Sequence, residues 1–559
     1  MKKLVPVFVV ILLFTLITVI SLVVYSNKKS DPKKENTAAE ANNTENVRTT
    51  ETPASSPAAA SNQQAGPAGN SVPRNLAAVP SDPQTSDAGN APAEAPDVSD
   101  NIVTTQHTAV IKGNSVSYTA DTGTMVLQCN GNYYELFFTA YTVDGGDASR
   151  PITFAFNGGP GSCSEYIHMG CLGPRRVALD DEGKTISMPD GIVDNENSVL
   201  DMTDLVFVDP VGTGYSRALT GTNADFYGYD NDIASIAEFI RLYVNRHNRW
   251  GSPKYIAGES YGTTRAVGLC KYLADNFSMN LNGLMLISSV NDFKALIEYN
   301  YNELPYATGI PTYAADAWYH KKVSAEYQAM SLEEYIQMVR QFAEKELVPA
   351  LFAGKSISDS EKEELAGKIS AYLGVSKEFV LSNNLRIGLD DFLTELLKDE
   401  KLVVGRYDGR ITGPATGGSI DSGEADPSDA SVNLAFGNTF MAYITTELGF
   451  QTDVPYRPTA DDIDDSWPFA DDDGLIAQED ILYECISKNP FLKVWVLCGY
   501  YDGATPFYSA EWTYNHVFLL DDYKDNIHFT YYPSGHMIYI NKEAFDKLRK
   551  DAEEWYQGQ

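Results

Sequence analysis

Basic residues are scarce in this sequence. Its 559 residues include 42 Lys and Arg against 76 Asp and Glu, which gives a formal net charge of −34 at pH 7. Proteins that bind nucleic acid need clustered positive charge to neutralise phosphates. The composition therefore excludes a nucleic-acid partner, and the acidic surface that it predicts favours solubility.

Metal-binding patterns are also missing. The six cysteines are scattered without a Cys-x-x-Cys pair, and the seven histidines show no paired spacing, so we expect no zinc site. The acidic stretch 461–473 does not fit a calcium-binding EF-hand, because Phe469 would occupy the first ligand position; we interpret it as a solvated loop. We predict neither a metal nor another cofactor. If the chain is exported, it can form one or two disulfides, whose pairing the sequence leaves open.

Only one hydrophobic run is long, residues 4–25, with lysines at positions 2, 3, 28 and 29 on its two sides. A run of this length can span a bilayer, and neither an Ala-x-Ala cleavage site nor a lipidation cysteine follows it. We therefore predict an uncleaved signal anchor in residues 1–29, with a cleaved signal peptide as the alternative. The balanced lysines do not settle the orientation.

Residues 30–100 contain few large apolar side chains and many Ala, Pro, Ser, Thr, Asn and acidic residues. Such a segment cannot bury enough surface to offset the entropy of ordering it, so we predict a flexible tether. An anchor followed by a tether suits a globular domain at the cell membrane but outside the cytoplasm, or a secreted domain if the anchor is cleaved.

From residue 101 onward the pattern predicts an α/β fold. Alternating apolar and polar positions at 108–119, 123–129 and 132–141 indicate antiparallel strands. Continuous apolar runs then indicate buried strands of a mostly parallel sheet, with helices between several of them; the runs are 152–156, 205–208, 255–257, 284–287, 494–497 and 528–532. We assign 101–290 and 481–559 to this core. Residues 291–480, helical at 331–401 and irregular at 405–480, form an insertion that we expect to cap the carboxyl edge of the sheet.

The pentapeptide Gly258-Glu259-Ser260-Tyr261-Gly262 lies between an apolar run and a helical stretch. A strand, a Gly-x-Ser-x-Gly corner and a helix form a nucleophile elbow, whose small residues let the strand and helix approach while the serine projects. The pattern alone is weak, because ordinary turns use the same residues.

Asp502 and His536 each follow a predicted strand, in Tyr-Asp-Gly-Ala-Thr-Pro and Ser-Gly-His-Met. Taken singly, each is better interpreted as a loop residue. Together with Ser260 they have the Ser, Asp, His order of α/β-hydrolases, with each at a strand end where catalytic groups collect. The main rival histidine, His168, precedes the serine and is in the wrong order.

Hydrolysis at such a serine also needs two backbone N–H groups that stabilise an oxyanion. The N–H of Tyr261 suits one of these positions, and the loop Asn157-Gly158-Gly159-Pro-Gly-Ser162 suits the other. A phosphate-binding loop is the competing interpretation, but the Lys-Ser/Thr ending of that motif is missing.

The chain resembles the serine carboxypeptidase family of the α/β-hydrolase fold. The segments that carry this resemblance are 157–164, 172–174, 209–216, 258–262, 501–506 and 535–537. The stretch 302–320, together with 172–176, further resembles the bacterial branch. The resemblance implies a triad of Ser260, Asp502 and His536, and an oxyanion hole of the Gly159 and Tyr261 amides. It also implies that Asn157, Gly158 and Glu259 bind the C-terminal carboxylate of a peptide.

One position departs from the family pattern. The second glutamate of the eukaryotic members corresponds to Cys171 here, so two glutamates cannot share a proton at these positions, and strict exopeptidase specificity is less firmly implied than hydrolysis. A carboxypeptidase acting on peptides through an acyl-enzyme is the leading hypothesis. An esterase or acyltransferase with the same triad, an inactive cell-surface binding protein and a structural surface protein are the alternatives, and the oligomeric state stays open.

Overall fold

The computed structural model describes residues 96–184, 186, 191–299, 301–416, 425–460, 463, 467–471, 474–519 and 521–558. The chain divides into two compact units, Met1–Ser86 and Asp87–Gln559, and all described residues belong to the second. The predicted anchor, nearly all of the predicted tether and most of the acidic stretch 461–473 lie outside the described residues. Within the described part of the chain, no helix is both long and apolar enough to cross a membrane.

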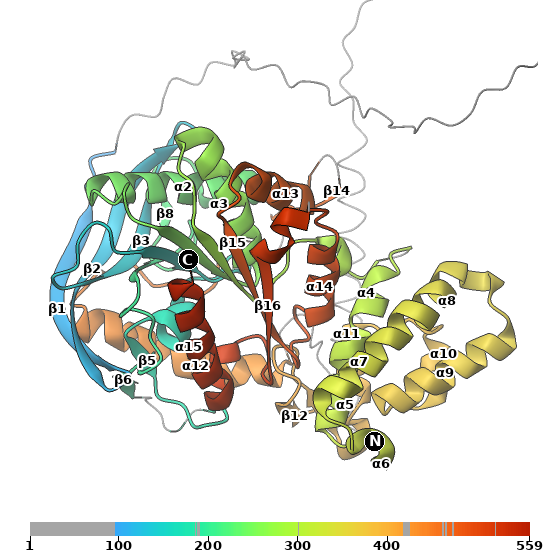
Figure 1. The fold of residues 1–559 in the computed structure, drawn as a ribbon. Helices are drawn as coiled ribbons and strands as arrows, with labels where there is room; N and C mark the ends of the chain where they lie inside the picture. The colour runs from blue at the N-terminus through green and yellow to red at the C-terminus, as the bar shows by residue number, and fades with distance from the viewer. Residues whose placement is uncertain are drawn as a thin grey trace, which may run out of the picture. The chain divides into compact units, whose positions relative to one another are not determined.

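A ten-stranded sheet forms the centre of the described unit (Figure 1). Its strands run in the order β1-β2-β3-β7-β4-β9-β10-β15-β16, and β8 (Arg217–Ala218) pairs with β3. The first three strands are antiparallel: β1 (Asn101–Ile111), β2 (Asn114–Cys129) and β3 (Asn132–Val143). The remaining six are parallel: β4 (Ile152–Phe156), β7 (Asp204–Val208), β9 (Lys254–Glu259), β10 (Gly283–Ile287), β15 (Lys493–Gly499) and β16 (Ile527–Tyr532).

Helices cover both faces of this sheet, as expected for strands that are apolar on both sides. One hydrophobic cluster joins one face to α2 (Tyr229–Arg246), α3 (Tyr261–Phe277), α13 (Glu479–Lys488) and α14 (Phe507–Asn515). A second cluster joins the other face to the π-helix η1 (Ile167–Leu172), α12 (Pro427–Ala442) and α15 (Lys542–Gln557). The predicted α/β-hydrolase architecture is confirmed.

The insertion between β10 and β15 begins with helices that have a hydrophobic cluster of their own. They are α4 (Leu304–Thr308), α5 (Ile310–Tyr319), α6 (Ala325–Gln328), α7 (Leu332–Phe342), α8 (Val348–Ala353), α9 (Asp359–Leu373), α10 (Lys377–Ser382) and α11 (Leu389–Glu395). Two-stranded pieces complete the unit: β5 (Arg175–Val177) with β6 (Ile192–Asp194), β11 (Leu402–Val404) with β12 (Thr412–Pro414), and β13 (Ala470–Asp471) with β14 (Gly474–Leu475). The helical part of the insertion is confirmed, whereas the domain boundaries stay a prediction.

Two local predictions were wrong. Residues 108–119 are not one strand, because Lys112 and Gly113 have φ angles of 49° and 73° and turn the chain between β1 and β2. Residues 405–480 are not irregular throughout, because α12 places Val432, Phe436 and Phe440 at helical spacing against the sheet. The segment around α12 is rich in Gly, Asp and Pro, and this composition hides the helical spacing of the apolar residues in the sequence.

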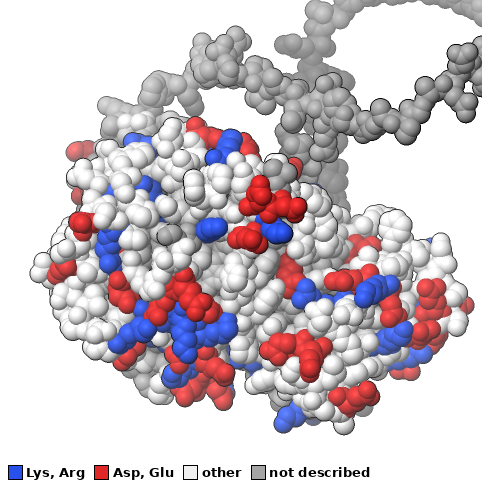
Figure 2. Space-filling model, viewed as in Figure 1, with Lys and Arg blue, Asp and Glu red and all other residues white. Residues whose placement is uncertain are grey.

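Charged side chains of both signs lie among one another on the face seen in Figure 2. Over α15, Lys542 pairs with Asp546 and Lys547 with Asp551, each one helical turn apart. Exposed pairs of this kind contribute little to stability, about 0.3–0.5 kcal/mol each.

Candidate active site

Ser260 occupies a sharp corner between β9 and α3. Its φ and ψ angles are 59° and −130°, a conformation that residues with a Cβ rarely adopt. A Cβ added to Gly258 would lie 2.1 Å from the carbonyl oxygen of Gly262, so only glycine fits there. The predicted nucleophile elbow is therefore present, with the strain that such a corner requires.

Asp502 and His536 meet at the carboxyl ends of β15 and β16. His536 Nδ1 lies 2.9 Å from Asp502 Oδ2, and both side chains are buried. Thr505 holds the aspartate, because its hydroxyl donates to Asp502 Oδ2 at 2.6 Å and its N–H donates to Asp502 Oδ1 at 2.9 Å. This arrangement fixes the imidazole so that Nε2 is left for the serine.

Electrostatics at His536 favour its charged form. Burial alone lowers the pKa of this imidazole, but the Asp502 carboxylate and its hydrogen bond, with Glu259 nearby, raise the pKa above its usual value. An imidazole that gains a proton readily beside a buried carboxylate is suited to take the proton of a serine hydroxyl.

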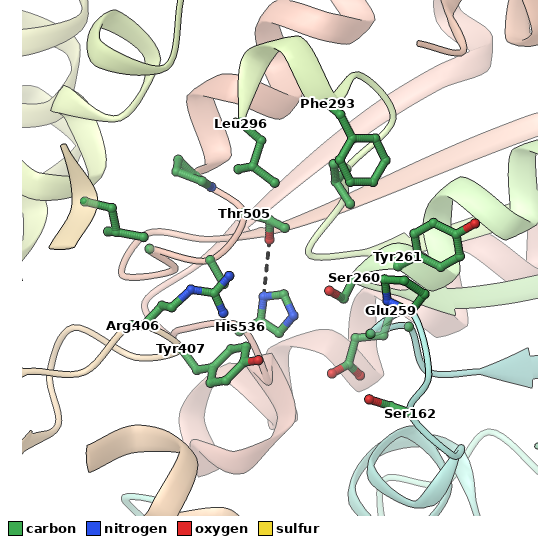
Figure 3. A pocket seen from close by; sticks show the side chains of 18 of the residues that line it. Ser162, Glu259, Ser260, Tyr261, Phe293, Leu296, Arg406, Tyr407, Thr505 and His536 are labelled. Carbon is green, nitrogen blue, oxygen red and sulfur yellow. Dashed lines mark hydrogen bonds between the residues drawn. The ribbon is translucent and has the colours of Figure 1, made fainter. Parts of the chain in front are cut away.

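Ser260 and His536 line one cavity of about 680 Å³. The Ser260 hydroxyl faces the His536 ring across this cavity in Figure 3. Among the described residues, the Ser260 and His536 side chains form no hydrogen bond with each other. Such catalytic hydrogen bonds often tighten only when substrate binds.

The loop that begins at Asn157 packs directly against the start of α3. A Cβ on Gly158 would lie only 2.4 Å from the backbone nitrogen of Tyr261, which shows how closely the two segments approach. No described residue accepts a hydrogen bond from the N–H of Gly159 or Tyr261. The two predicted oxyanion donors therefore lie at one edge of the cavity with their N–H groups available.

Glu259 is a buried carboxyl on the cavity wall, next to the serine in sequence. Its side chain is 2% exposed, and burial raises its pKa to about 7 against the opposing effects of His536, Tyr539 and Asn157. Asn157 Oδ1 accepts from the Ile167 N–H at 3.0 Å, and the Asn157 side chain lies near enough to Glu259 to lower the pKa of its carboxyl. The three predicted carboxylate-binding residues, Asn157, Gly158 and Glu259, all line the cavity.

The rival histidine lies elsewhere. His168 stacks on Phe207 with ring centroids 4.1 Å apart, and its Nε2 lies 2.6 Å from Tyr141 Oη. Burial lowers the pKa of His168 to about 3, so it stays neutral in the core and does not line the cavity. Among the described residues, no group of three or more His, Cys, Asp and Glu side chains could hold a metal ion.

A segment of the insertion, residues 405–410, was missed as part of the site. The carbonyl of Tyr407 accepts from the His536 N–H at 2.6 Å, and the carbonyl of Arg406 accepts from the Gly503 N–H at 3.0 Å. The Tyr407 ring lies 5.2 Å from the His536 ring, and Figure 3 shows Arg406 and Tyr407 beside it. The loops that carry Asp502 and His536 are therefore both joined to the insertion by backbone hydrogen bonds, which the local sequence does not predict.

The opposite end of the cavity is apolar. Phe293 and Leu296 lie above Ser260 in Figure 3. Tyr261, Trp467 and Phe469 also line the cavity and belong to the same hydrophobic cluster. The apolar and polar ends thus lie on the two sides of Ser260.

A model of the family described as serine carboxypeptidase matches residues 115–522. The chain belongs to this family. It is 31% identical over 156 residues to the pheromone-processing carboxypeptidase kex1 of Schizosaccharomyces japonicus, covering 27% of this chain and 28% of that relative. It is 30% identical over 157 residues to serine carboxypeptidase-like 36 of Arabidopsis thaliana, covering 27% of this chain and 30% of that relative. These alignments span less than a third of either relative's length.

A solved carboxypeptidase shares the fold. The crystal structure of a prohormone-processing carboxypeptidase, Kex1(delta)p from Saccharomyces cerevisiae, superposes with a TM-score of 0.51 at 15% identity and covers 79% of this chain and 91% of that chain. At this identity the likeness supports the α/β-hydrolase fold alone.

Proposed function

We propose that the protein is a serine carboxypeptidase that hydrolyses the C-terminal peptide bond of its substrates. The observation that carries the proposal is the buried carboxyl of Glu259, beside the nucleophile and on the wall of the same cavity as Asn157. A protonated carboxyl can donate a hydrogen bond to a peptide's terminal carboxylate, whereas an ionised one repels it. A site that binds this carboxylate next to the serine places the last peptide bond of the substrate at the nucleophile.

The chemistry follows from the triad. His536 takes the proton of Ser260 as the hydroxyl attacks the scissile carbonyl, and Asp502 stabilises the imidazolium that forms. The Gly159 and Tyr261 amides donate to the oxyanion of the tetrahedral intermediate. His536 then gives its proton to the leaving amine, and a water molecule activated by His536 hydrolyses the acyl-enzyme.

We assign the two substrate residues to the two ends of the cavity. The P1 side chain suits the apolar end around Phe293 and Leu296, and the residue that leaves suits the polar end between Glu259 and Tyr407. The substrate is thus a peptide or protein chain with a free C-terminus. We also propose that the catalytic domain works outside the cytoplasm, held by residues 1–29 or released from them, on the support of the N-terminal hydrophobic run.

The proposal predicts a preference for free acids. A peptide with a free C-terminus should exceed its C-terminal amide in kcat/KM by about 10- to 100-fold near pH 5, because a charge-assisted hydrogen bond is worth about 1.5–3 kcal/mol. Initial rates on the acid, the amide and a simple ester of the same acyl group provide the measurement. Equal rates on acid and amide, with faster ester cleavage, would favour the esterase alternative instead.

A further inference from the structure

Tyr539 lies directly behind Glu259 in the 3₁₀-helix η9 (Ile538–Ile540), three residues after His536. Its ring is fully buried, and its hydroxyl donates to Glu259 Oε2 at 2.8 Å. The two residues that this hydrogen bond joins lie 280 positions apart in the sequence.

Small residues on η1 make room for this tyrosine. A Cβ on Gly170 would lie 2.3 Å from Tyr539 Cε2, so only glycine leaves space for the ring. The next residue, Cys171, interacts electrostatically with both Glu259 and Tyr539 and brings no second carboxyl to them. The place beside Glu259 is therefore taken by a phenol.

A phenol and a carboxyl act differently as neighbours of Glu259. A second glutamate can give or accept a proton, so the pair titrates as a unit. A tyrosine hydroxyl has a pKa near 10 in water, and burial raises that of Tyr539 well above this value. It stays a donor throughout the working range of the enzyme, which leaves Glu259 Oε1 as the oxygen that can carry a proton toward the substrate.

We propose that Tyr539 is the positioning residue for C-terminal recognition, donating permanently to Glu259 Oε2 so that the Glu259 acid presents its other oxygen to the substrate carboxylate. This inference rests on the proposed function. Recognition by this pair depends on the titration of a single carboxyl.

The other titratable groups that face this carboxyl are His536 and Asp502 from the two catalytic loops and Cys171 from η1. Tyr166, at the start of η1, is a further titratable group near Tyr539. Burial raises the pKa of Glu259 to about 7 in this setting. Above this pH the carboxylate loses its proton and repels the substrate, so KM for a free-acid peptide should rise while KM for an ester should show no such rise.

The test is Tyr539→Phe, followed by kcat and KM for a free-acid peptide and an ester between about pH 5 and pH 9. The ionised form of Glu259 loses a donor in this variant, so its pKa goes up. The alkaline rise in KM for the acid should move upward by about half to one pH unit. Loss of orientation should also raise KM at acidic pH by about 3- to 10-fold. A purely structural role would change kcat or stability without moving this profile.

Tyr532→Phe is the matched control. Tyr532 is equally buried and donates to Asp551 Oδ2 at the same 2.8 Å, but its partner Asp551, unlike Glu259, does not line the cavity. Tyr532→Phe removes the same kind of hydrogen bond and should not shift the pH dependence of KM for the free-acid peptide. Labelling of Ser260 by a fluorophosphonate shows in each variant whether the fold and triad are intact.

An unshifted KM profile in Tyr539→Phe, in an enzyme that prefers free acids, overturns the role of Tyr539 but keeps the proposed function. A wild-type enzyme without that preference overturns the proposed function itself. If Tyr539→Phe does not fold, Glu259→Gln decides, because its amide oxygen still accepts from Tyr539 while its NH₂ donates at every pH. The alkaline rise in KM should vanish in Glu259→Gln, and its persistence contradicts the proposal.

Discussion

Replacing Ser260 by alanine is expected to lower kcat for peptides and esters by about 10⁶-fold, to the level that binding and the oxyanion hole sustain without a nucleophile. Alanine keeps the Cβ, so the positive φ angle costs it no more than it costs serine, and the free energy of unfolding should stay close to that of the wild type. Steady-state rates and thermal unfolding of the purified variant provide the measurement.

Ser382→Ala is a suitable control, because Ser382 is an exposed serine on α10 in the helical part of the insertion. It should retain wild-type rates. Turnover by Ser260→Ala above about a hundredth of the wild-type rate would assign the chemistry to another residue.

Asp502→Asn is expected to lower kcat by about 10⁴-fold near pH 7. An asparagine amide facing Nδ1 favours the wrong imidazole tautomer, and the pKa of His536 loses the carboxylate that holds it above its usual value. The Thr505 N–H can still donate to the amide oxygen at the Oδ1 position, and the Thr505 hydroxyl, which donates to Oδ2 in the wild type, can accept from the new NH₂ instead, so the loop should keep its shape. The rate at saturating substrate measures the effect.

Asp551→Asn provides the comparison, because this carboxylate also accepts from a buried side chain, Tyr532, but lies outside the cavity. Its kcat should stay within about twofold of the wild type. A similar loss of kcat in both variants would show that the effect of Asp502→Asn is structural.

Local motifs predicted the parallel sheet correctly, and the same motifs supplied the candidate triad. Ser260, Asp502 and His536 each stand at the end of a buried apolar run, and their chain order matches the fold. The elbow at Ser260 needs glycine on both sides, so its chemistry is visible within five residues. These features depend on neighbours in sequence, which is why they could be predicted without coordinates.

The supporting contacts could not be predicted in this way. Tyr539 meets Glu259 across 280 residues, and nothing near either residue predicts the pairing. The carbonyl of Tyr407 reaches His536 from an insertion whose position depends on packing between clusters. The sequence predicted that Cys171 departs from the family pattern, but the Tyr539 phenol beside Glu259 became visible only in three dimensions.

Product analysis by mass spectrometry tests the central claim most directly. A peptide with a free C-terminus, incubated with the protein at about pH 5, should lose residues one at a time from that end, and each released product should be a single amino acid. The same peptide with a C-terminal amide should remain largely intact. Internal fragments, or equal digestion of the amidated peptide, would contradict the account.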